Sequence, residues 1–186
     1  MDQEHLLLCS PTGSGKTLTA FLSIIDQLVR RALDNKLDKR VYCVYISPIK
    51  ALANDIERNL IGPLTEISES YLPSRAQEIK VGLRTGDTPQ SERQKMLRNP
   101  PHILITTPES LAIAITSPRF QPIVSEVEYM IVDELHSLVP SKRGVHLALT
   151  LSYLDTLLKR PVQRIGISAT MEPLETVAEY LVSSDD

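Results

Sequence analysis

The residues best suited to chemistry lie near the start of the chain, where residues 10–17 read Ser-Pro-Thr-Gly-Ser-Gly-Lys-Thr. Glycines at this spacing let the backbone curl so that its N–H groups point at phosphate oxygens, within reach of the Lys16 ammonium. Thr17 offers a hydroxyl to a magnesium ion that accompanies a nucleotide, and the loop would open a helix whose positive dipole end faces the anion. The pattern predicts a nucleoside triphosphate site formed by Thr12, Gly13, Ser14, Gly15, Lys16 and Thr17.

A glycine-rich turn before an ordinary helix is the simpler alternative for this loop. The order of the flanking segments favours the nucleotide site. The apolar residues 6–9 predict a buried strand directly before the loop, and apolar residues recur at helical spacing after it.

A second group with chemical potential is the pair Asp133 and Glu134, which follows an apolar strand predicted over residues 127–133. We expect Asp133 to hold magnesium through its water shell, and Glu134 to orient and deprotonate an attacking water. An acidic pair alone is a weak signal, because such pairs often begin a helix and favour its dipole. Combined with the upstream loop, the pair indicates nucleotide hydrolysis. His136 is either a satisfied capping histidine or a group that relays the state of the terminal phosphate.

Four predicted strands are followed by a Ser or Thr close to a proline. The pairs are Ser10-Pro11, Ser47-Pro48, Thr107-Pro108 and, one turn apart, Thr170 and Pro173. Ser or Thr as N-cap with Pro in the first turn is typical of a helix start. Open α/β sheets bind ligands at the carboxyl edge, where these starts would gather. Capping alone explains any single pair, but several on one edge suggest that some face the phosphates of a nucleic-acid backbone.

Apolar runs and helical periodicities alternate along the chain, and they must position these residues. Strands are predicted at 6–9, 41–46, 79–84, 102–106, 127–133 and 164–168, and helices at 18–29, 49–60, 89–97, 108–115, 147–158 and 174–181. Residues 79–84 alternate apolar and charged side chains, which indicates a strand near an edge of the sheet. Gly62-Pro63 is expected to interrupt the second helix. The pattern predicts a single α/β domain over residues 1–186, with a largely parallel central sheet flanked by helices.

The composition is that of an ordinary globular domain. Of 186 residues, 42% are apolar and 23% charged, and no run approaches the ~18 apolar residues of a membrane helix. Cys9 and Cys43 lack metal-ligand spacing and are expected to be buried free thiols of a cytoplasmic protein with no membrane partner. The net charge of −3 gives no global basic field, so any nucleic-acid contact would be local.

The order of the motifs resembles that of superfamily 2 helicases. Residues 133–136 read Asp-Glu-Leu-His, a DExH box, and residues 168–170 read Ser-Ala-Thr, the motif that follows it in those proteins. The stretches 142–146 and 164–173 resemble the large helicase-related (Lhr) branch in particular. The resemblance covers nearly the whole chain and implies a RecA-like P-loop NTPase domain, the first motor domain of a helicase, with ATP and Mg²⁺ as its ligands.

This resemblance also implies roles for individual residues. The ATPase residues would be Lys16, Thr17, Asp133 and Glu134, with His136 in the same box, while Ser168 and Thr170 would couple hydrolysis to movement. Stretches 47–52, 84–88 and 106–111 look like the family's nucleic-acid motifs. The implied contacts with DNA or RNA, mostly to phosphates, are Ser47, Pro48, Lys50, Gly86, Asp87, Thr107, Pro108 and Arg143.

The resemblance further implies that the chain is a piece of a motor. Only nine residues precede the loop, so the upstream segment with which many such helicases grip adenine is missing. The family's second RecA-like domain, which brings an arginine to the transferring phosphate, is also absent from residues 1–186. Such an arginine is worth ~10³–10⁵ in rate. We therefore expect a second RecA-like domain as a partner and little turnover by the isolated chain.

Three rival interpretations have their own discriminators. Residues 35–38 spell Asn-Lys-Leu-Asp, a guanine-recognition motif, but they follow the first helix rather than a late strand, which favours a solvated turn. A small-molecule kinase would carry an arginine-rich lid, and nothing in the chain resembles one. A nucleotide-gated nucleic-acid-binding module without turnover stays open, because carboxylates alone do not establish hydrolysis.

Overall fold

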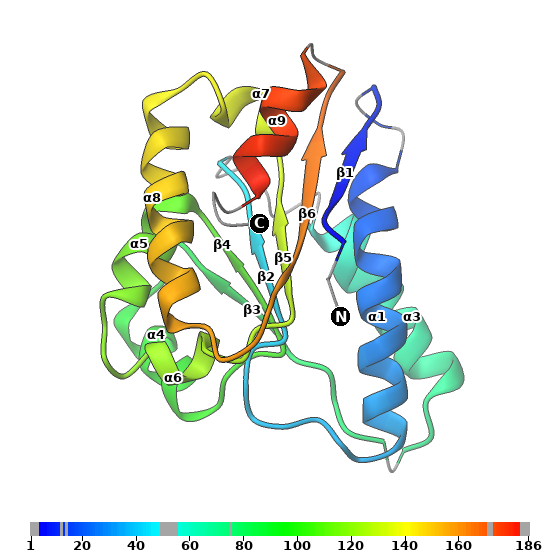
Figure 1. Cartoon of the computed structure of the whole chain (residues 1–186). Coiled ribbons are helices and arrows are strands. Elements are labelled where there is room, and N and C mark those ends of the chain that lie inside the picture. The colour runs from blue at the N-terminus through cyan, green and yellow to red at the C-terminus, as the bar shows by residue number, and fades with distance from the viewer. Residues whose placement is uncertain are drawn as a thin grey trace.

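Six parallel strands form the centre of the molecule in the computed structural model, which describes residues 4–11, 13, 15–48, 56–74, 76–170 and 173–182. The strands are β1 (Leu6–Cys9), β2 (Cys43–Ile46), β3 (Val81–Arg84), β4 (Ile103–Thr106), β5 (Tyr129–Val132) and β6 (Gln163–Ser168). They lie in the order β1-β6-β5-β2-β4-β3, and all paired neighbours run parallel. The predicted α/β fold with a parallel central sheet is confirmed (Figure 1).

Helices cover both faces of the sheet (Figure 1). The helices are α1 (Lys16–Leu33), the π-helical η1 (Glu57–Ile61), α3 (Gly62–Tyr71), α4 (Gln90–Arg98), α5 (Pro108–Ile115), α6 (Gln121–Val124), α7 (Leu135–Leu138), α8 (Lys142–Leu157) and α9 (Leu174–Leu181). Apolar side chains of α1, η1 and α3 share one core cluster, and those of α5 to α9 share the other. In the described ranges, no helix is long and apolar enough to cross a membrane.

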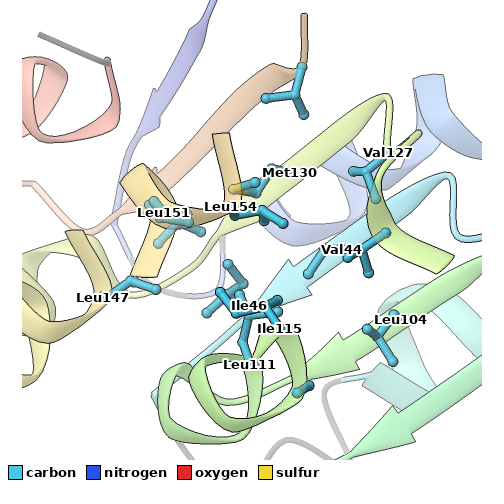
Figure 2. Packing of buried hydrophobic residues seen from close by; sticks show 14 of the residues in the cluster. Val44, Ile46, Leu104, Leu111, Ile115, Val127, Met130, Leu147, Leu151 and Leu154 are labelled. Carbon is cyan, nitrogen blue, oxygen red and sulfur yellow. The ribbon is translucent and has the colours of Figure 1, made fainter. Parts of the chain in front are cut away.

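Strand β2 shows why the sheet needs both layers. Successive side chains of a strand point to opposite faces. Cys43 and Tyr45 accordingly join the cluster on the α1 side, whereas Val44 and Ile46 join the opposite cluster. None of the four is more than 1% exposed. Figure 2 shows Val44 and Ile46 in the apolar core with labelled side chains of α5 and α8. The prediction of a strand buried on both faces is confirmed here.

The strand predicted at residues 6–9 is present, but the prediction that it is buried is wrong. Strand β1 is an edge strand that pairs with β6 alone among the described residues, and Leu6 is 44% exposed. Cys9 is likewise only partly buried, whereas Cys43 is fully buried. Four consecutive apolar residues indicate a strand but carry no information on its place in the strand order. The strand predicted near an edge, β3, does lie at the other edge.

Among the described residues, the helices differ from the prediction at Gly62-Pro63 and at two short helices, and one further segment is not described. Residues 49–55, which hold most of the predicted second helix, lie outside the described residues. Gly62-Pro63 does not interrupt the helix after them, because the π-turns of η1 pass directly into α3 there, with proline in the first turn of α3. Proline lacks an N–H and is tolerated in a first turn. The short helices α6 and α7 were not predicted, since four residues show no periodicity.

Candidate nucleotide site and nucleic-acid edge

The strand order sorts the predicted site residues into two groups. Because all six strands are parallel, their carboxyl ends meet at one edge of the sheet. The phosphate loop, the DExH box and the Ser-Ala-Thr motif follow β1, β5 and β6, which are contiguous. Three of the predicted nucleic-acid stretches follow β2, β4 and β3, which are also contiguous. Residues far apart in the sequence thus gather on one edge, with the predicted nucleotide residues on one half, called the nucleotide half below, and the predicted nucleic-acid residues on the other, called the nucleic-acid half.

The described part of the phosphate loop has the backbone that its glycines predict. Gly13 and Gly15 have φ values of 83° and 85°, in the left-handed region that side chains disfavour. Gly15 is the N-cap of α1, and its carbonyl accepts the Thr19 N–H at 2.9 Å. Thr12 and Ser14 lie outside the described residues. The prediction of a helix start at Ser10-Pro11 is wrong, because the turn that contains Gly13 and Gly15 separates this pair from α1.

Lys16 points its ammonium into this loop. Its Nζ donates to the carbonyl oxygen of Pro11 at 2.8 Å and also to that of Ser10. Thr17, the next residue, lies partly buried in the first turn of α1. Lys16 and Thr17, both predicted to bind the nucleotide complex, are therefore on the helix that follows the loop. A lysine held by loop carbonyls can exchange them for phosphate oxygens, which are stronger acceptors because they are charged.

Asp133 lies one residue beyond β5 and is only 8% exposed. The hydroxyl of Tyr45, on neighbouring β2, donates to one carboxylate oxygen, and the N–H of Glu134 donates to the other at 2.7 Å. Burial raises the pKa of Asp133, while these two hydrogen bonds and the charge of Lys16 oppose the rise. The charge of Lys16 acts on Asp133, as expected for groups that follow β1 and β5 at the same edge of the sheet.

Glu134 has a left-handed backbone, with φ of 57°, which is uncommon for a residue other than glycine. Such strain is concentrated at functional sites, because only a supporting structure maintains it. Its carboxylate lies 3.0 Å from Nε2 of His136. The other ring nitrogen of His136, Nδ1, accepts the Ala169 N–H at 3.0 Å, which leaves the proton on Nε2 for Glu134. His136 therefore joins the DExH box to the Ser-Ala-Thr motif.

The two residues predicted to couple hydrolysis to movement, Ser168 and Thr170, flank this contact. Ser168 is 1% exposed, and its hydroxyl has no hydrogen-bond partner among the described residues. Thr170 is exposed. A buried hydroxyl without a partner is costly, so Ser168 Oγ is an acceptor and donor still open to a ligand or a water.

On the other half of the edge, Thr107 and Pro108 form the helix start that the sequence predicts. Thr107 is the N-cap of α5; its Oγ1 accepts the Ser110 N–H at 3.4 Å and donates to the Ser110 hydroxyl at 3.0 Å.

Ser47 is 1% exposed and donates its N–H to the Thr106 carbonyl at 3.1 Å. Pro48 is described, but Lys50 lies outside the described residues, as does the first part of the helix expected after Ser47-Pro48, residues 49–55. Pro173 precedes α9 without a side-chain cap from Thr170.

Arg143 links three segments of this half. Its Nε and Nη2 bond to the two carboxylate oxygens of Glu109, at 2.6 and 3.2 Å, and Nη2 also donates to the carbonyl of Pro48 at 3.0 Å. The pair holds the start of α8 against the first turn of α5. About half of each side chain stays exposed, 47% for Arg143 and 49% for Glu109. The predicted charge is thus present at the edge, but it is paired.

Gly86 and Asp87 lie in a turn that Arg93 of α4 holds in place. The Arg93 guanidinium donates to the carbonyls of Thr88, Thr85 and Gly86, at 2.9, 3.2 and 2.9 Å. Unlike Gly82, Gly144 and Gly166, Gly86 has open space where a Cβ would point. Its φ also lies outside the left-handed range. The fold itself does not require glycine here, so the residue is free to serve close approach by a ligand.

Tyr45 and Arg93 were not predicted to support the site. A signal for Tyr45 exists, because a tyrosine inside an apolar strand needs a partner for its hydroxyl. Arg93 carries no such signal, since an arginine in a polar helix resembles any solvated residue.

A parallel sheet with a glycine-rich lysine loop and an acidic pair at the same edge defines a RecA-like nucleoside triphosphatase motor domain. Residues 1–179 match the family model described as DEAD/DEAH box helicase. The chain belongs to this family.

Its relatives place it in the Lhr branch, as the sequence predicts. It is 52% identical over 183 residues to the ATP-dependent helicase Lhr-Core of Methanocaldococcus jannaschii, covering 97% of this chain and 21% of the relative. It is 49% identical over 184 residues to the Lhr helicase/uracil glycosylase of Escherichia coli, covering 96% of this chain and 12% of the relative. The chain thus spans only a small part of the length of the curated relatives it matches.

A solved structure agrees with this assignment. The Mycobacterium smegmatis helicase Lhr, bound to ssDNA and AMP-PNP, superposes with a TM-score of 0.84 at 47% identity, covering 97% of this chain and 22% of that chain. The matched part of the Lhr helicases is their first motor domain.

Proposed function

We propose that the chain is the ATP-binding domain of an ATP-dependent DNA or RNA helicase, which binds Mg-ATP at the nucleotide half of the edge and backbone phosphates at the other half. The strand order carries this proposal, because Lys16, Asp133 and the Ser-Ala-Thr motif lie at or just after the carboxyl ends of three contiguous strands, β1, β5 and β6. The named relatives support it. One is called an ATP-dependent helicase, and another was solved with ssDNA and AMP-PNP bound.

In this proposal Lys16 neutralises the terminal phosphates, and Glu134 orients and deprotonates the attacking water. Thr17 and Asp133 would hold magnesium. A hydroxyl and a carboxylate suit this hard cation, which keeps several waters and takes its remaining oxygens from the nucleotide. The burial of Asp133, which disfavours its charge, fits a site that receives a cation. Magnesium, when bound, would offset the charge of the transferring phosphate.

Coupling to movement would use the contact that His136 makes with Glu134 and Ala169, together with Ser168 and Thr170. A second RecA-like domain is the proposed partner, bringing the arginine that completes the site and making the combined protein a translocating, unwinding enzyme. We place this protein in the cytoplasm. The proposed DNA or RNA contacts remain Ser47, Pro48, Lys50, Gly86, Asp87, Thr107, Pro108 and Arg143.

The test uses Lys16→Ala and Glu134→Gln, with a fluorescent ATP analogue for binding and phosphate release for hydrolysis. The 186-residue chain should bind Mg-ATP weakly and hydrolyse it slowly or not at all. In a full-length protein that carries this domain, Lys16→Ala should weaken both binding and hydrolysis, because it removes a charge from the phosphates. Glu134→Gln should bind nucleotide but stop hydrolysis, since it keeps the shape and loses the base.

Three results would count against the proposal. Near-normal turnover by Glu134→Gln would exclude that residue as the base. Turnover by the isolated chain at the full-length rate would remove the need for a second domain. Preference for GTP over ATP would point to residues 35–38 as a base-recognition motif.

A further inference from the structure

Tyr45 is a polar side chain inside an apolar strand, and it reaches the acidic end of the neighbouring strand. Its backbone pairs with Ile131 of β5, two residues before Asp133. The side chain is long enough to cover that offset, and its hydroxyl donates to a carboxylate oxygen of Asp133. Only 1% of Tyr45 is exposed, so the hydroxyl bonds in a buried setting.

The same ring also contacts the helix that follows the phosphate loop. Tyr45 and Phe21 of α1 have ring centroids 5.2 Å apart, tilted by 33°. Phe21 is fully buried and lies little more than one turn after Lys16. Tyr45 therefore contacts both the loop helix and the acidic strand end through one rigid side chain.

The hydroxyl fixes an orientation that Asp133 would not keep by itself. The Glu134 N–H bonds to the other carboxylate oxygen at 2.7 Å, so the two donors together set the plane of the group. Removing one donor leaves the carboxylate free to rotate about the remaining bond. Partners that orient ligating groups typically change metal affinity or activity ~10–100-fold when they are mutated.

We infer that Tyr45 is a positioning residue that orients Asp133 for the magnesium–nucleotide complex. The inference rests on the proposed function. Because Tyr45 lies on β2, two residues before Ser47, the hydrogen bond also connects the nucleotide half of the edge to a strand of the nucleic-acid half.

Tyr45→Phe tests this inference, since it keeps the ring and its contact with Phe21 and removes only the hydroxyl. In the 186-residue chain, binding of a fluorescent ATP analogue is titrated with Mg²⁺. We expect the half-saturating Mg²⁺ concentration to rise about tenfold or more. In a full-length protein carrying this domain, kcat should fall at limiting Mg²⁺ and recover in part at high Mg²⁺, with binding of metal-free nucleotide unchanged.

Tyr42→Phe is the matched control. Tyr42 is also 1% exposed and precedes the same strand, but its hydroxyl accepts the Asp38 N–H at 2.8 Å, at the opposite end of the sheet. Tyr42→Phe should lower the melting temperature without changing the half-saturating Mg²⁺ concentration. A Tyr45→Phe titration that coincides with the wild-type curve would overturn this inference alone. Wild-type protein without Mg²⁺-dependent nucleotide binding would overturn the proposed function as well.

Discussion

Nδ1 of His136 accepts the backbone N–H of Ala169 at 3.0 Å, while Nε2 of the same ring lies 3.0 Å from the Glu134 carboxylate. One imidazole thus connects the proposed base to the segment that follows β6. A change in the position of Glu134 would reach Ala169 through a rigid planar ring. This geometry favours the relay over the capping role that the sequence left open for His136.

The two contacts can be separated by two variants. The side-chain oxygen of Asn matches the position of Nδ1, so His136→Asn keeps an acceptor for the Ala169 N–H. It loses the contact with the Glu134 carboxylate. The side-chain amide of Gln reaches the position of Nε2, so His136→Gln keeps a donor for the Glu134 carboxylate and loses the acceptor for the Ala169 N–H. If His136 is a relay, both variants should bind ATP normally but lose roughly tenfold or more of nucleic-acid-stimulated hydrolysis, since a hydrogen bond to a charged group is worth about 1.5–3 kcal/mol.

The comparison needs unwinding and hydrolysis measured on the same preparations of full-length protein. A capping role would instead lower thermal stability in both variants and leave stimulated hydrolysis unchanged. That result would return His136 to the structural alternative.

The two glycines of the β3 region give a second prediction. At Gly86 an added Cβ meets nothing within 4 Å, whereas at Gly82 it would lie 2.7 Å from Cγ of Pro101. Gly86→Ala should therefore keep the stability of the wild type and weaken DNA or RNA binding roughly tenfold, because a methyl group would stand where a backbone approaches. The measurement is fluorescence anisotropy with labelled single strands.

Gly82→Ala is the control for this pair. Crowding against Pro101 should cost about 1–3 kcal/mol of unfolding free energy. Its nucleic-acid affinity should not change at temperatures where the protein remains folded. Unchanged affinity in Gly86→Ala would remove Gly86 from the proposed track.

Which candidate residues lie near one another was easier to predict from the sequence than the contacts that support them. Lys16 and Asp133 could be placed together because parallel strands share a carboxyl edge, and that rule needs no strand order. The separation into two halves does need the order, which no local pattern carries. The edge position of β1 was missed for the same reason. Glu109 could not be identified as the partner of Arg143 without knowing that α5 and α8 are neighbours.

At the other end of the sheet, Glu128 holds three arginines and gives a prediction about stability. It accepts bonds from Arg31 at 2.9 and 2.8 Å, from Arg40 at 2.6 Å and from Arg160 at 3.3 Å. Burial alone would raise the pKa of Glu128, but the arginines hold it below its usual value. A lowered carboxylate pKa stabilises the fold above the unfolded-state value, ~4.3, and the stabilisation is lost as the pH falls through the folded pKa.

Glu128→Gln should therefore lower the free energy of unfolding at pH 7 by about 2–3 kcal/mol. This lies below the range for fully buried pairs, because Arg31 and Arg160 keep part of their solvation. The difference from wild type should shrink as the pH falls below the unfolded-state pKa, ~4.3, toward the lower folded value. Glu126→Gln, at a neighbour whose side chain is 35% exposed and shares Arg160, should have a smaller effect at every pH. Urea denaturation across the pH range measures both variants, and a pH-independent loss would contradict this assignment.

The Arg143–Glu109 pair yields the last prediction, because its two members should change nucleic-acid binding in opposite directions. Arg143→Ala removes a positive charge near Pro48 and Thr107. It should weaken binding about equally for every sequence and lower the slope of log affinity against log salt by about one unit. Glu109→Gln frees the guanidinium from its carboxylate, so binding should tighten and the slope should steepen. ATP binding should be unaffected in both, since neither residue belongs to the phosphate loop.

A salt titration of both variants and of the double variant in full-length protein separates this role from a structural one. Glu109→Gln should gain affinity only while Arg143 is present, so the double variant should resemble Arg143→Ala. Removing either member of a partly exposed pair costs little stability, typically ~0–1 kcal/mol, so all three proteins should remain folded. An unchanged slope in every variant would mean that Arg143 serves only to hold α8 against α5 and that the nucleic acid follows another path.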